Sequence, residues 1–359
     1  MADLTLVAGS LGIVGSEVVS QLAACGRNVV GVSRRAASPG RPGRHLTLDL
    51  TDAAACRAAL GAVAGVTHIV YAALFEKPDL GQGWLDGDQI ATNRLMLANL
   101  LDGVTAGNTA LRHVTLLQGA KAYGVHLGQI PIPAKEDAPR HIHPNFYWAQ
   151  EDLLRERQGG SGGAGWRWTI LRPQVVLGSA PGSAMNMLAA VGAYAAISRA
   201  LGLPLVYPGV GHRITEATDV RLLARAILWA GEAAAAADRI FNVTNGDAFV
   251  WQNLWPAIAR RFGMEVGLPH PMPLATVMPG HAAVWDRLVR EHGLQPGCLE
   301  AFIGSSWQFA DFAFSRTHST ASLLSTIKIR HAGFGECIDT EASLDWHLAE
   351  LQRRRVLPP

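Results

Sequence analysis

The chain has 359 residues, of which 49% are apolar and only 17% are charged, and its formal net charge is +2. This length and apolar content predict one large folded domain or two modest ones and exclude a disordered chain. Both signs of charge are interspersed, so there is no electrostatic reason to expect binding to nucleic acid or to a membrane surface.

Short apolar runs alternate with helical stretches through the first 175 residues, and one more run follows later. Such runs without strict alternation are typical of strands buried on both faces, which need helical crossovers. They predict an α/β fold with a Rossmann-type doubly wound parallel sheet. The predicted strands are "LTLVAG", "VVGVSR", "HLTLDL", "THIVYAA", "HVTLLQG", "WTILRP" and, at 239–244, "RIFNVT".

The remaining stretches lack this rhythm and predict a second unit. We expect a dinucleotide-binding domain over 1–180, to which 210–247 return, and a smaller, mostly helical substrate lobe formed by 181–209 and 248–359. The longest apolar segment, 187–205, contains glycines and is interrupted by Arg199. It therefore predicts a buried helix of that lobe rather than a membrane span.

The segment "VAGSLGIVGSEVV" follows the first predicted strand and opens a helix. Gly9 permits a tight turn, Gly12 lets the backbone approach a pyrophosphate, and Gly15 lets helix and strand pack closely. Leu11 and Ile13, between these glycines, belong to the same predicted cofactor contact. The alternative is a glycine-rich turn without a ligand, which this strand and helix context disfavours.

The end of the second predicted strand reads "VSRRA", with Ser33, Arg34 and Arg35 and no acidic residue. An NAD site would place Asp or Glu here for the ribose hydroxyl, whereas a 2′-phosphate favours arginine. Because guanidinium groups bind phosphate oxygens in a bidentate way, the sequence favours NADPH/NADP+. The alternative is a solvated arginine pair on a turn.

Two further strand ends point to the same ligand. Asp49 and Leu50 follow the third strand, where an adenine would lie, and Ala72 and Ala73 end the fourth with side chains small enough to admit a ribose. Both pairs can equally be ordinary strand ends.

The segment "NFYWAQED" contains Tyr147, and the residue four places later is Glu151 instead of the lysine that commonly accompanies a catalytic tyrosine. Lys121, after the fifth strand, lies at the carboxyl edge of the predicted sheet, where open α/β sheets bind ligands. A tyrosine hydroxyl has a pKa near 10 unless a neighbouring cation lowers it, so Lys121 is predicted to act on Tyr147 across space. Alternatively, the two are a half-buried aromatic residue and an exposed lysine.

At this point the chain resembles the progesterone 5β-reductase and iridoid synthase-like group of short-chain dehydrogenases, often called PRISE enzymes. The matching segments run almost end to end in the order of that family: "GSLGIVG", "VSRR", "DLTD", "HIVYAAL", "NRLMLANLL", "LLQGAKAYG", "EDAPR", "PNFYWAQEDLL", "ILRPQVVLG", "MNMLAAVGAYAAI", "FNVTNGDAFVWQNLW", "FADF" and "HAGFGECIDT". The resemblance implies an NADPH-dependent reductase that acts on the C=C bond of α,β-unsaturated carbonyl compounds, with Lys121 and Tyr147 as its catalytic residues.

Some positions depart from the family pattern. Trp148 stands where many members have a second tyrosine, and the loop after Lys121 lacks the expected "GPF" ending, so the substrate is expected to differ. Gln118 and Gly119 replace the serine that orients a ketone in ordinary dehydrogenases of this class. Together with Pro173, at the end of the sixth strand, and Val175, shortly after it, they complete the predicted cofactor contacts.

The predicted reaction is conjugate hydride transfer from NADPH, with the Tyr147 hydroxyl stabilising the enolate oxygen and Lys121 making that hydroxyl more acidic. A small apolar enone, enal or ketone is the expected partner. Each residue of the predicted substrate pocket can equally be plain core. These residues are Met185, Asn186, Trp251, Phe312 and Phe334.

Metal sites and disulfides are not expected. The four cysteines are far apart without CxxC spacing, and the chain begins without a basic leader, which together favour a reducing cytoplasm. His141 and His143 lack a third ligand nearby, so both are predicted to be structural, and Asp219 is predicted to cap a helix.

Three other functions remain open. The chain can be a carbonyl reductase that uses the same tyrosine and lysine, a nucleotide-sugar epimerase or dehydratase, or a dinucleotide sensor without catalysis. The arginines of "VSRR" and the absence of a lysine four residues after Tyr147 argue against the epimerase. The sequence leaves the oligomeric state open, a homodimer included.

Overall fold

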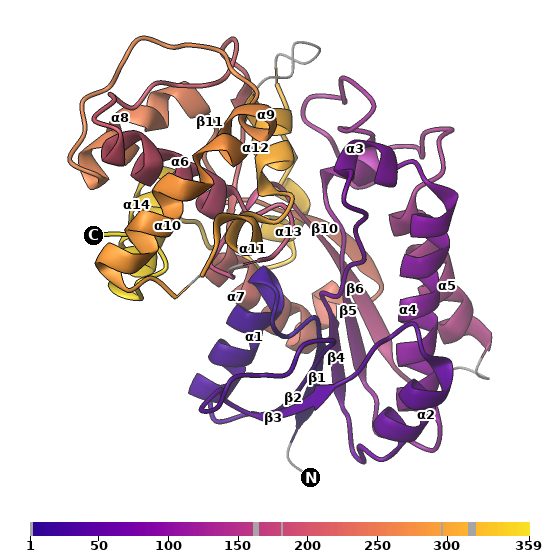
Figure 1. Ribbon diagram of the computed structural model, residues 1–359. Coiled ribbons are helices and arrows are strands. Elements are labelled where there is room, and N and C mark those ends of the chain that lie inside the picture. Colours follow the sequence, from indigo (N-terminus) through magenta and orange to yellow (C-terminus); the bar gives the residue numbers. More distant parts are fainter. Residues whose placement is uncertain (1–2, 161–164, 181, 296, 315–320) are drawn as a thin grey trace.

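A computed structural model describes residues 3–160, 165–180, 182–295, 297–314 and 321–359. Its main sheet has seven parallel strands in the order β10-β6-β5-β4-β1-β2-β3 (Figure 1). All seven predicted strands are confirmed, including the late one that returns to the sheet edge. Their bounds are β1 Leu4–Ala8, β2 Asn28–Ser33, β3 Arg44–Thr47, β4 His68–Tyr71, β5 His113–Leu117, β6 Arg167–Pro173 and β10 Arg239–Val243.

Helices cover both faces of this sheet, which makes it doubly wound as predicted (Figure 1). Helices α1 (Ile13–Ala24) and α7 (Val220–Glu232) pack on one face. Helices α2 (Ala53–Gly61), α4 (Gly87–Thr105) and α5 (Phe146–Gly160) pack on the other. Along the strands other than β3, the apolar side chains divide between these two cores, which is why those strands are nearly continuous apolar runs in the sequence.

A third apolar core holds the remaining long helices together. Helix α6 is buried along almost its whole length, as expected of the longest apolar segment. Within the described residues, no helix is both long enough and apolar enough to cross a bilayer. The helices of this lobe are α6 (Met187–Ala200), α8 (Trp251–Arg261), α10 (Ala282–His292), α11 (Leu299–Ile303), α12 (Ser306–Phe314) and α14 (Thr340–Arg353). The domain boundaries stay a prediction.

Short elements connect these units. They are the strands β7 (Val176–Leu177), β8 (Ile214–Thr215), β9 (Thr218–Asp219) and β11 (Phe249–Val250), the helices α3 (Leu80–Gly83), α9 (Leu274–Val277) and α13 (Ile327–His331), and the 3₁₀ helices η1 (Ala120–Tyr123), η2 (Ala234–Ala236) and η3 (Met278–His281).

Asp219 joins the sheet to the lobe. Its carboxylate caps α7 by accepting a hydrogen bond from the backbone N–H of Arg221, as predicted. From α14 it also accepts a hydrogen bond from the Ser343 hydroxyl at 2.6 Å, and the His347 imidazole lies 3.3 Å away. A single buried carboxylate therefore anchors both helices.

The order of the strands decides where a ligand can bind. The chain leaves β1 toward β2 on one side and reaches β4 on the other, so the connections reverse between β1 and β4. A crevice outside the carboxyl ends of the strands forms at such a switch point. The turn after β1 and the residues that follow β4, β5 and β6 all lie at this edge.

Candidate active site

The glycine turn after β1 is packed against the end of β4. Gly9 has φ +78°, and a Cβ atom there would lie 2.6 Å from the carbonyl oxygen of Ala72. A Cβ atom on Gly15 would overlap the carbonyl oxygen of Gly9. Gly12 caps α1 without a capping side chain, and the first turn of α1 has no acidic residue. The N-terminal N–H groups of α1 therefore suit a phosphate.

Basic side chains gather beside this turn. Arg35 Nη2 lies 3.5 Å from the carbonyl oxygen of Leu11, and Arg34 is close enough to Asp49 to lower the pKa of that carboxyl. Arg41, which the sequence analysis missed, donates from Nη1 to the carbonyl oxygen of Ser10 at 3.3 Å. Burial and the nearby charges of Arg354 and Arg35 lower the pKa of Arg41. An anion bound here would relieve that repulsion.

The other predicted adenosine contacts are partly engaged in the fold. The Ser33 hydroxyl donates to the carbonyl oxygen of Arg35 at 2.5 Å and lies 3.1 Å from Nε2 of His45. The Asp49 carboxylate accepts from the backbone N–H of Thr51 at 2.9 Å, and this hydrogen bond is the main cause of its lowered pKa. Leu50 is buried in the core, so it can offer only backbone atoms.

Lys121 and Tyr147 lie side by side at the carboxyl edge of the sheet. Lys121 belongs to η1, Tyr147 is the second residue of α5, and the lysine Nζ atom is 5.8 Å from the centre of the tyrosine ring. Asn145 ties the two segments together, because it donates to the carbonyl oxygen of Lys121 at 2.8 Å and accepts from the N–H of Tyr147 at 2.9 Å. Both side chains are buried.

Glu76 and Trp84 surround the lysine, and sequence reasoning found neither. Lys121 Nζ lies 3.2 Å from Oε1 of Glu76 and 4.3 Å from the centre of the Trp84 ring. Burial lowers the pKa of Lys121, and Glu76 opposes that change. Burial raises the pKa of Tyr147 well above its usual value; Glu76 raises it further and the Arg172 charge opposes the rise. No motif marks the "FEKP" segment that carries the carboxylate.

Glu151 occupies the position where the usual lysine would stand, and the structure gives it a different role. Its carboxylate lies 3.4 Å from Arg172 and 3.1 Å from Arg155, and Arg140 is 3.4 Å away. Arg172 also donates to Oε1 of Gln118 at 2.8 Å. This network braces α5 against β6, so the position is structural rather than catalytic.

The residues after β5 and β6 are held in place by backbone and amide contacts. Gln118 Nε2 donates to the carbonyl oxygen of Tyr147 at 2.9 Å, so its amide positions the tyrosine. Gly119 leaves room for the tyrosine hydroxyl, which would lie 3.3 Å from a Cβ atom at that position. Pro173 ends β6 next to Gly119, and the carbonyl oxygen of Val175 accepts from Thr218.

The five predicted pocket residues lie in different surroundings. Phe312 packs edge-on against Trp84 at 5.2 Å and so approaches Lys121. Asn186 is buried and caps α6, and the neighbouring Met185 is half-buried with φ +56°. Trp251 lies in the lobe core, whereas Phe334 packs with Trp229 in the core under β10. Aromatic residues occur both in protein cores and in ligand pockets, so the sequence alone could not separate the two kinds of position.

The histidines of the 124–145 loop form aromatic contacts. The His141 ring lies 4.2 Å from the Trp148 ring and 5.8 Å from the His126 ring. No set of three or more metal-ligating side chains comes together in the described ranges. Tyr123, on the same side of the site, is turned away, because its hydroxyl donates to Oδ1 of Asn242 at 2.6 Å.

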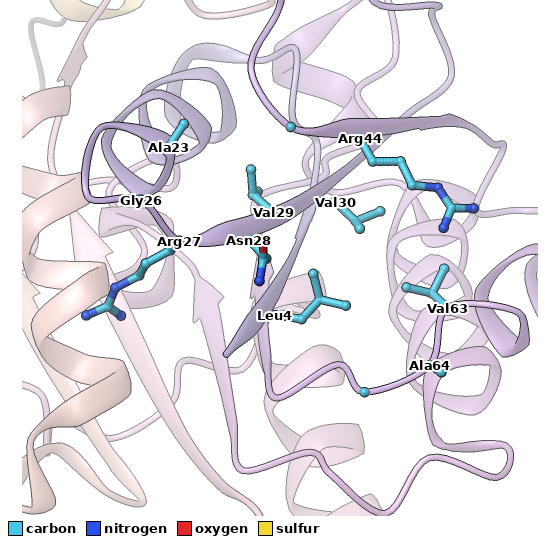
Figure 2. A pocket seen from close by; sticks show the side chains of 12 residues that line it. Leu4, Ala23, Gly26, Arg27, Asn28, Val29, Val30, Arg44, Val63 and Ala64 are labelled. Atoms are coloured by element: carbon cyan, nitrogen blue, oxygen red, sulfur yellow. The ribbon is translucent and has the colours of Figure 1, made fainter. Parts of the chain in front are cut away.

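A surface hollow shown in Figure 2 lies at the opposite end of the strands. It is lined by the first residues of β1, β2 and β3, namely Leu4, Asn28 and Arg44, and by the turn that precedes β2. Ligands of open α/β sheets bind outside the carboxyl ends of the strands. This hollow therefore belongs to the other edge and does not form part of the candidate active site.

Residues 55–319 match the family described as the PRISE-like Rossmann-fold domain. The chain belongs to this family. Among curated proteins, this PRISE-like chain is 31% identical to an (S)-8-oxocitronellyl enol synthase of Catharanthus roseus, over 92% of this chain and 87% of the relative. It is 29% identical to the enzyme of the same name from Antirrhinum majus, over 99% and 93%. The PRISE-like chain is thus an enzyme of the short-chain dehydrogenase/reductase type.

Solved structures share the fold at lower identity. A short-chain dehydrogenase/reductase superfamily protein of Agrobacterium tumefaciens with bound NAD has a TM-score of 0.65 and 19% identity, and covers 98% of both chains. The Thermus thermophilus UDP-glucose 4-epimerase in complex with NAD has a TM-score of 0.64 and 18% identity, over 96% of this chain and 99% of that one. At such identities these two structures show only that the PRISE-like chain shares their fold.

Proposed function

We propose that the protein is an NADPH-dependent reductase that adds hydride to the β-carbon of α,β-unsaturated carbonyl compounds. The observation that carries this proposal is the placement of Lys121 beside Tyr147 from a different segment, while Glu151 fills the usual lysine position. The names of the curated relatives support it, because they state an enol product. An enol is what conjugate hydride addition yields before tautomerisation.

The cofactor site fits a dinucleotide phosphate. The close contact of Gly9 with Ala72 and the uncapped start of α1 form a cradle that side chains would fill, and backbone N–H groups at such a helix end bind pyrophosphate. Arg34, Arg35 and Arg41 would hold the 2′-phosphate. When bound, NADPH supplies the hydride.

Tyr147 acts as a hydrogen-bond donor to the substrate oxygen. Burial and Glu76 keep the pKa of Tyr147 above its usual value, so its hydroxyl stays protonated at neutral pH. Conjugate addition places negative charge on the carbonyl oxygen, and a donor positioned there stabilises that charge. Solvent can protonate the α-carbon, so the tyrosine need not lose its proton. Lys121 contributes positive charge beside the ring.

The surroundings of Lys121 favour an apolar substrate. Trp84 and Phe312 contact each other edge-on, and Phe146 lies 5.5 Å from the lysine Nζ atom. Gln308 of α12 accepts from the N–H of Leu80 at 3.0 Å, which brings the lobe against α3 next to this aromatic wall. Flat apolar molecules with one carbonyl group suit such a wall, because aromatic rings bury large apolar areas.

Label transfer tests the proposal. The protein is incubated with NADPH deuterated at the transferred position and with a panel of small enals, enones and ketones, and the products are analysed by NMR. Deuterium on the carbon β to the carbonyl is expected. Deuterium on the carbinol carbon would instead make the protein a carbonyl reductase, which the same Tyr147 and Lys121 could serve.

A further inference from the structure

We propose that Glu76 is a positioning residue of the active site, whose carboxylate holds the Lys121 ammonium over Trp84 and sets the net charge that Tyr147 experiences. This inference deepens the proposed function and rests on it where turnover is concerned. Its electrostatic part concerns the protein alone and can be measured without any substrate.

The ion pair is closed off from solvent. The Glu76 and Lys121 side chains are 6% and 11% exposed, and the carboxylate is the sole anionic partner of the lysine among the described side chains. A charge buried this deeply loses its hydration, and the usual outcome is that it is paired or becomes neutral. Without Glu76, Lys121 would rest on the faces of aromatic rings with no counter-charge.

A side chain of α4 holds the Glu76 carboxylate in place. Gln89, which is fully buried on α4, donates to Oε2 of Glu76 at 2.6 Å and accepts from the N–H of Lys77 at 2.8 Å. One turn further along α4, Asn93 both donates to the carbonyl oxygen of Phe75 and accepts from its N–H. Side chains locked by hydrogen bonds in this way hold an active-site charge at one place before any ligand arrives.

Gly83 leaves room for the Gln89 amide. A Cβ atom on Gly83 would lie 2.5 Å from Oε1 of Gln89, so the amide occupies the volume that a side chain would need. The next residue, Trp84, presents its ring to the lysine. The segment from Glu76 to Trp84 therefore supplies both the anion and the aromatic face between which the ammonium sits.

Glu76 also balances the charge near Tyr147. The charged groups around the hydroxyl are Glu76 from the loop after β4, Lys121 from η1 and Arg172 from β6. The titratable rings of His126 and His141, from the loop between η1 and α5, pack beyond Trp84 and Trp148. Glu76 offsets part of the positive charge of Lys121 and Arg172. Its negative charge raises the pKa of Tyr147, so the hydroxyl keeps its proton.

The test compares Glu76→Gln with the wild-type protein by NMR. The chain has only four lysines, so protein labelled with ¹³C and ¹⁵N in lysine gives few Nζ and Cε signals, and Lys121→Arg assigns the one of interest. Removal of the carboxylate should make Lys121 lose its proton at a pH at least one unit lower, a tenfold change in acidity. A folded Glu76→Gln protein with an unchanged Lys121 titration overturns the proposal.

Asp86→Asn is the matched control. Asp86 pairs with the neighbouring Lys77 at 2.5 Å and caps α4, and asparagine can still cap a helix. This variant removes the same charge close by without touching the buried pair, so the Lys121 titration should stay unchanged. If Glu76→Gln does not fold, the NMR spectrum of the wild-type protein at pH 8 provides the test. Ammonium signals for Lys121 support the proposal, and signals of a neutral amine overturn it.

Turnover provides the second readout. Removal of Glu76 lowers the pKa of both Lys121 and Tyr147, so the alkaline fall in kcat on an enal should begin at least one unit earlier in Glu76→Gln. If the ion pair were purely structural, its removal would lower stability and leave the alkaline fall in kcat at the wild-type pH. Glu76→Asp keeps the charge and should restore most of the wild-type pH profile. Absence of turnover in the wild-type protein would contradict the proposed function and leave the NMR result standing.

Discussion

The hydroxyl oxygen of Tyr147 lies opposite Gly119, where an added Cβ atom would come within 3.3 Å of it. Gly119 has an extended backbone with φ −174°, so a side chain there would be limited by space and not by conformation. A serine side chain after β5 would crowd the tyrosine hydroxyl, and one of the two would have to shift by a few tenths of an ångström.

Gly119→Ser should therefore displace the Tyr147 hydroxyl by a few tenths of an ångström. Because misplaced catalytic groups are costly, kcat should fall on the order of tenfold. Steady-state kinetics on a reactive enal measure the effect. Gly128→Ser is the control, since a Cβ atom at Gly128 meets nothing within 4 Å among the described atoms. Equal activity of the two variants would show that the tyrosine does not need this space.

Removal of the Tyr147 hydroxyl separates conjugate reduction from ketone reduction. Tyr147→Phe should keep measurable activity on an enal, with a loss on the order of 10²-fold or less, as for one oxyanion donor. Lys121→Ala should cost a similar amount, and the double variant less than the product, because the two residues act as one unit. Tyr123→Phe, whose hydroxyl binds Asn242, should stay close to the wild-type rate. Abolished turnover in Tyr147→Phe would favour carbonyl reduction.

The arginines beside the glycine turn should determine the choice of cofactor. NADPH should bind at least tenfold more tightly than NADH, about 1.4 kcal/mol, and titration calorimetry gives both dissociation constants. Replacing Arg34 and Arg35 by Ala should weaken NADPH and leave NADH nearly unchanged, and Arg41→Ala should act in the same direction. Arg44→Ala, at the other end of β3, serves as the control. Comparable affinities of the wild-type protein for both cofactors would refute the prediction.

Glu216 should make stability depend on pH. Burial raises its pKa to about 7; the Leu324 N–H and the Thr244 hydroxyl oppose this rise, Asp247 adds to it and Arg330 counteracts it. The folded protein then holds a proton that the unfolded chain, with a glutamate pKa near 4.3, has lost. Stability therefore falls as pH rises from about 4 to 7.

Urea unfolding of wild-type and Glu216→Gln proteins measures this effect. Glutamine mimics the protonated carboxyl group and can still accept from the Leu324 N–H, which lies 2.6 Å from Oε2 of Glu216. The variant should be more stable than the wild-type protein at pH 8 by on the order of 3 kcal/mol, and this difference should shrink as the pH falls and be nearly gone at about pH 4. A difference that stays constant between these pH values would show that the carboxyl titrates normally.

Local patterns in the sequence determined the sheet and the position of its ligand edge. Strands buried on both faces must be apolar along their length, so "LTLVAG" and the other runs were recognisable one by one. The spacing of Gly9, Gly12 and Gly15 follows from a turn in which Gly9 and Gly15 lack room for a Cβ atom and Gly12 has little. Lys121 and Tyr147 could be paired because both lie in the connection that leaves β5 at the carboxyl edge of the sheet.

Only the tertiary structure decided what surrounds that pair. Glu76 and Arg41 lie in loops without periodicity, and their roles depend on contacts with Lys121 and Ser10, which are 45 and 31 residues away along the chain. The surroundings of the five predicted pocket residues could not be foreseen for a related reason. Burial stabilises an aromatic ring in a core and in a ligand pocket alike, so composition cannot tell Phe312 from Phe334 until long-range packing places each of them.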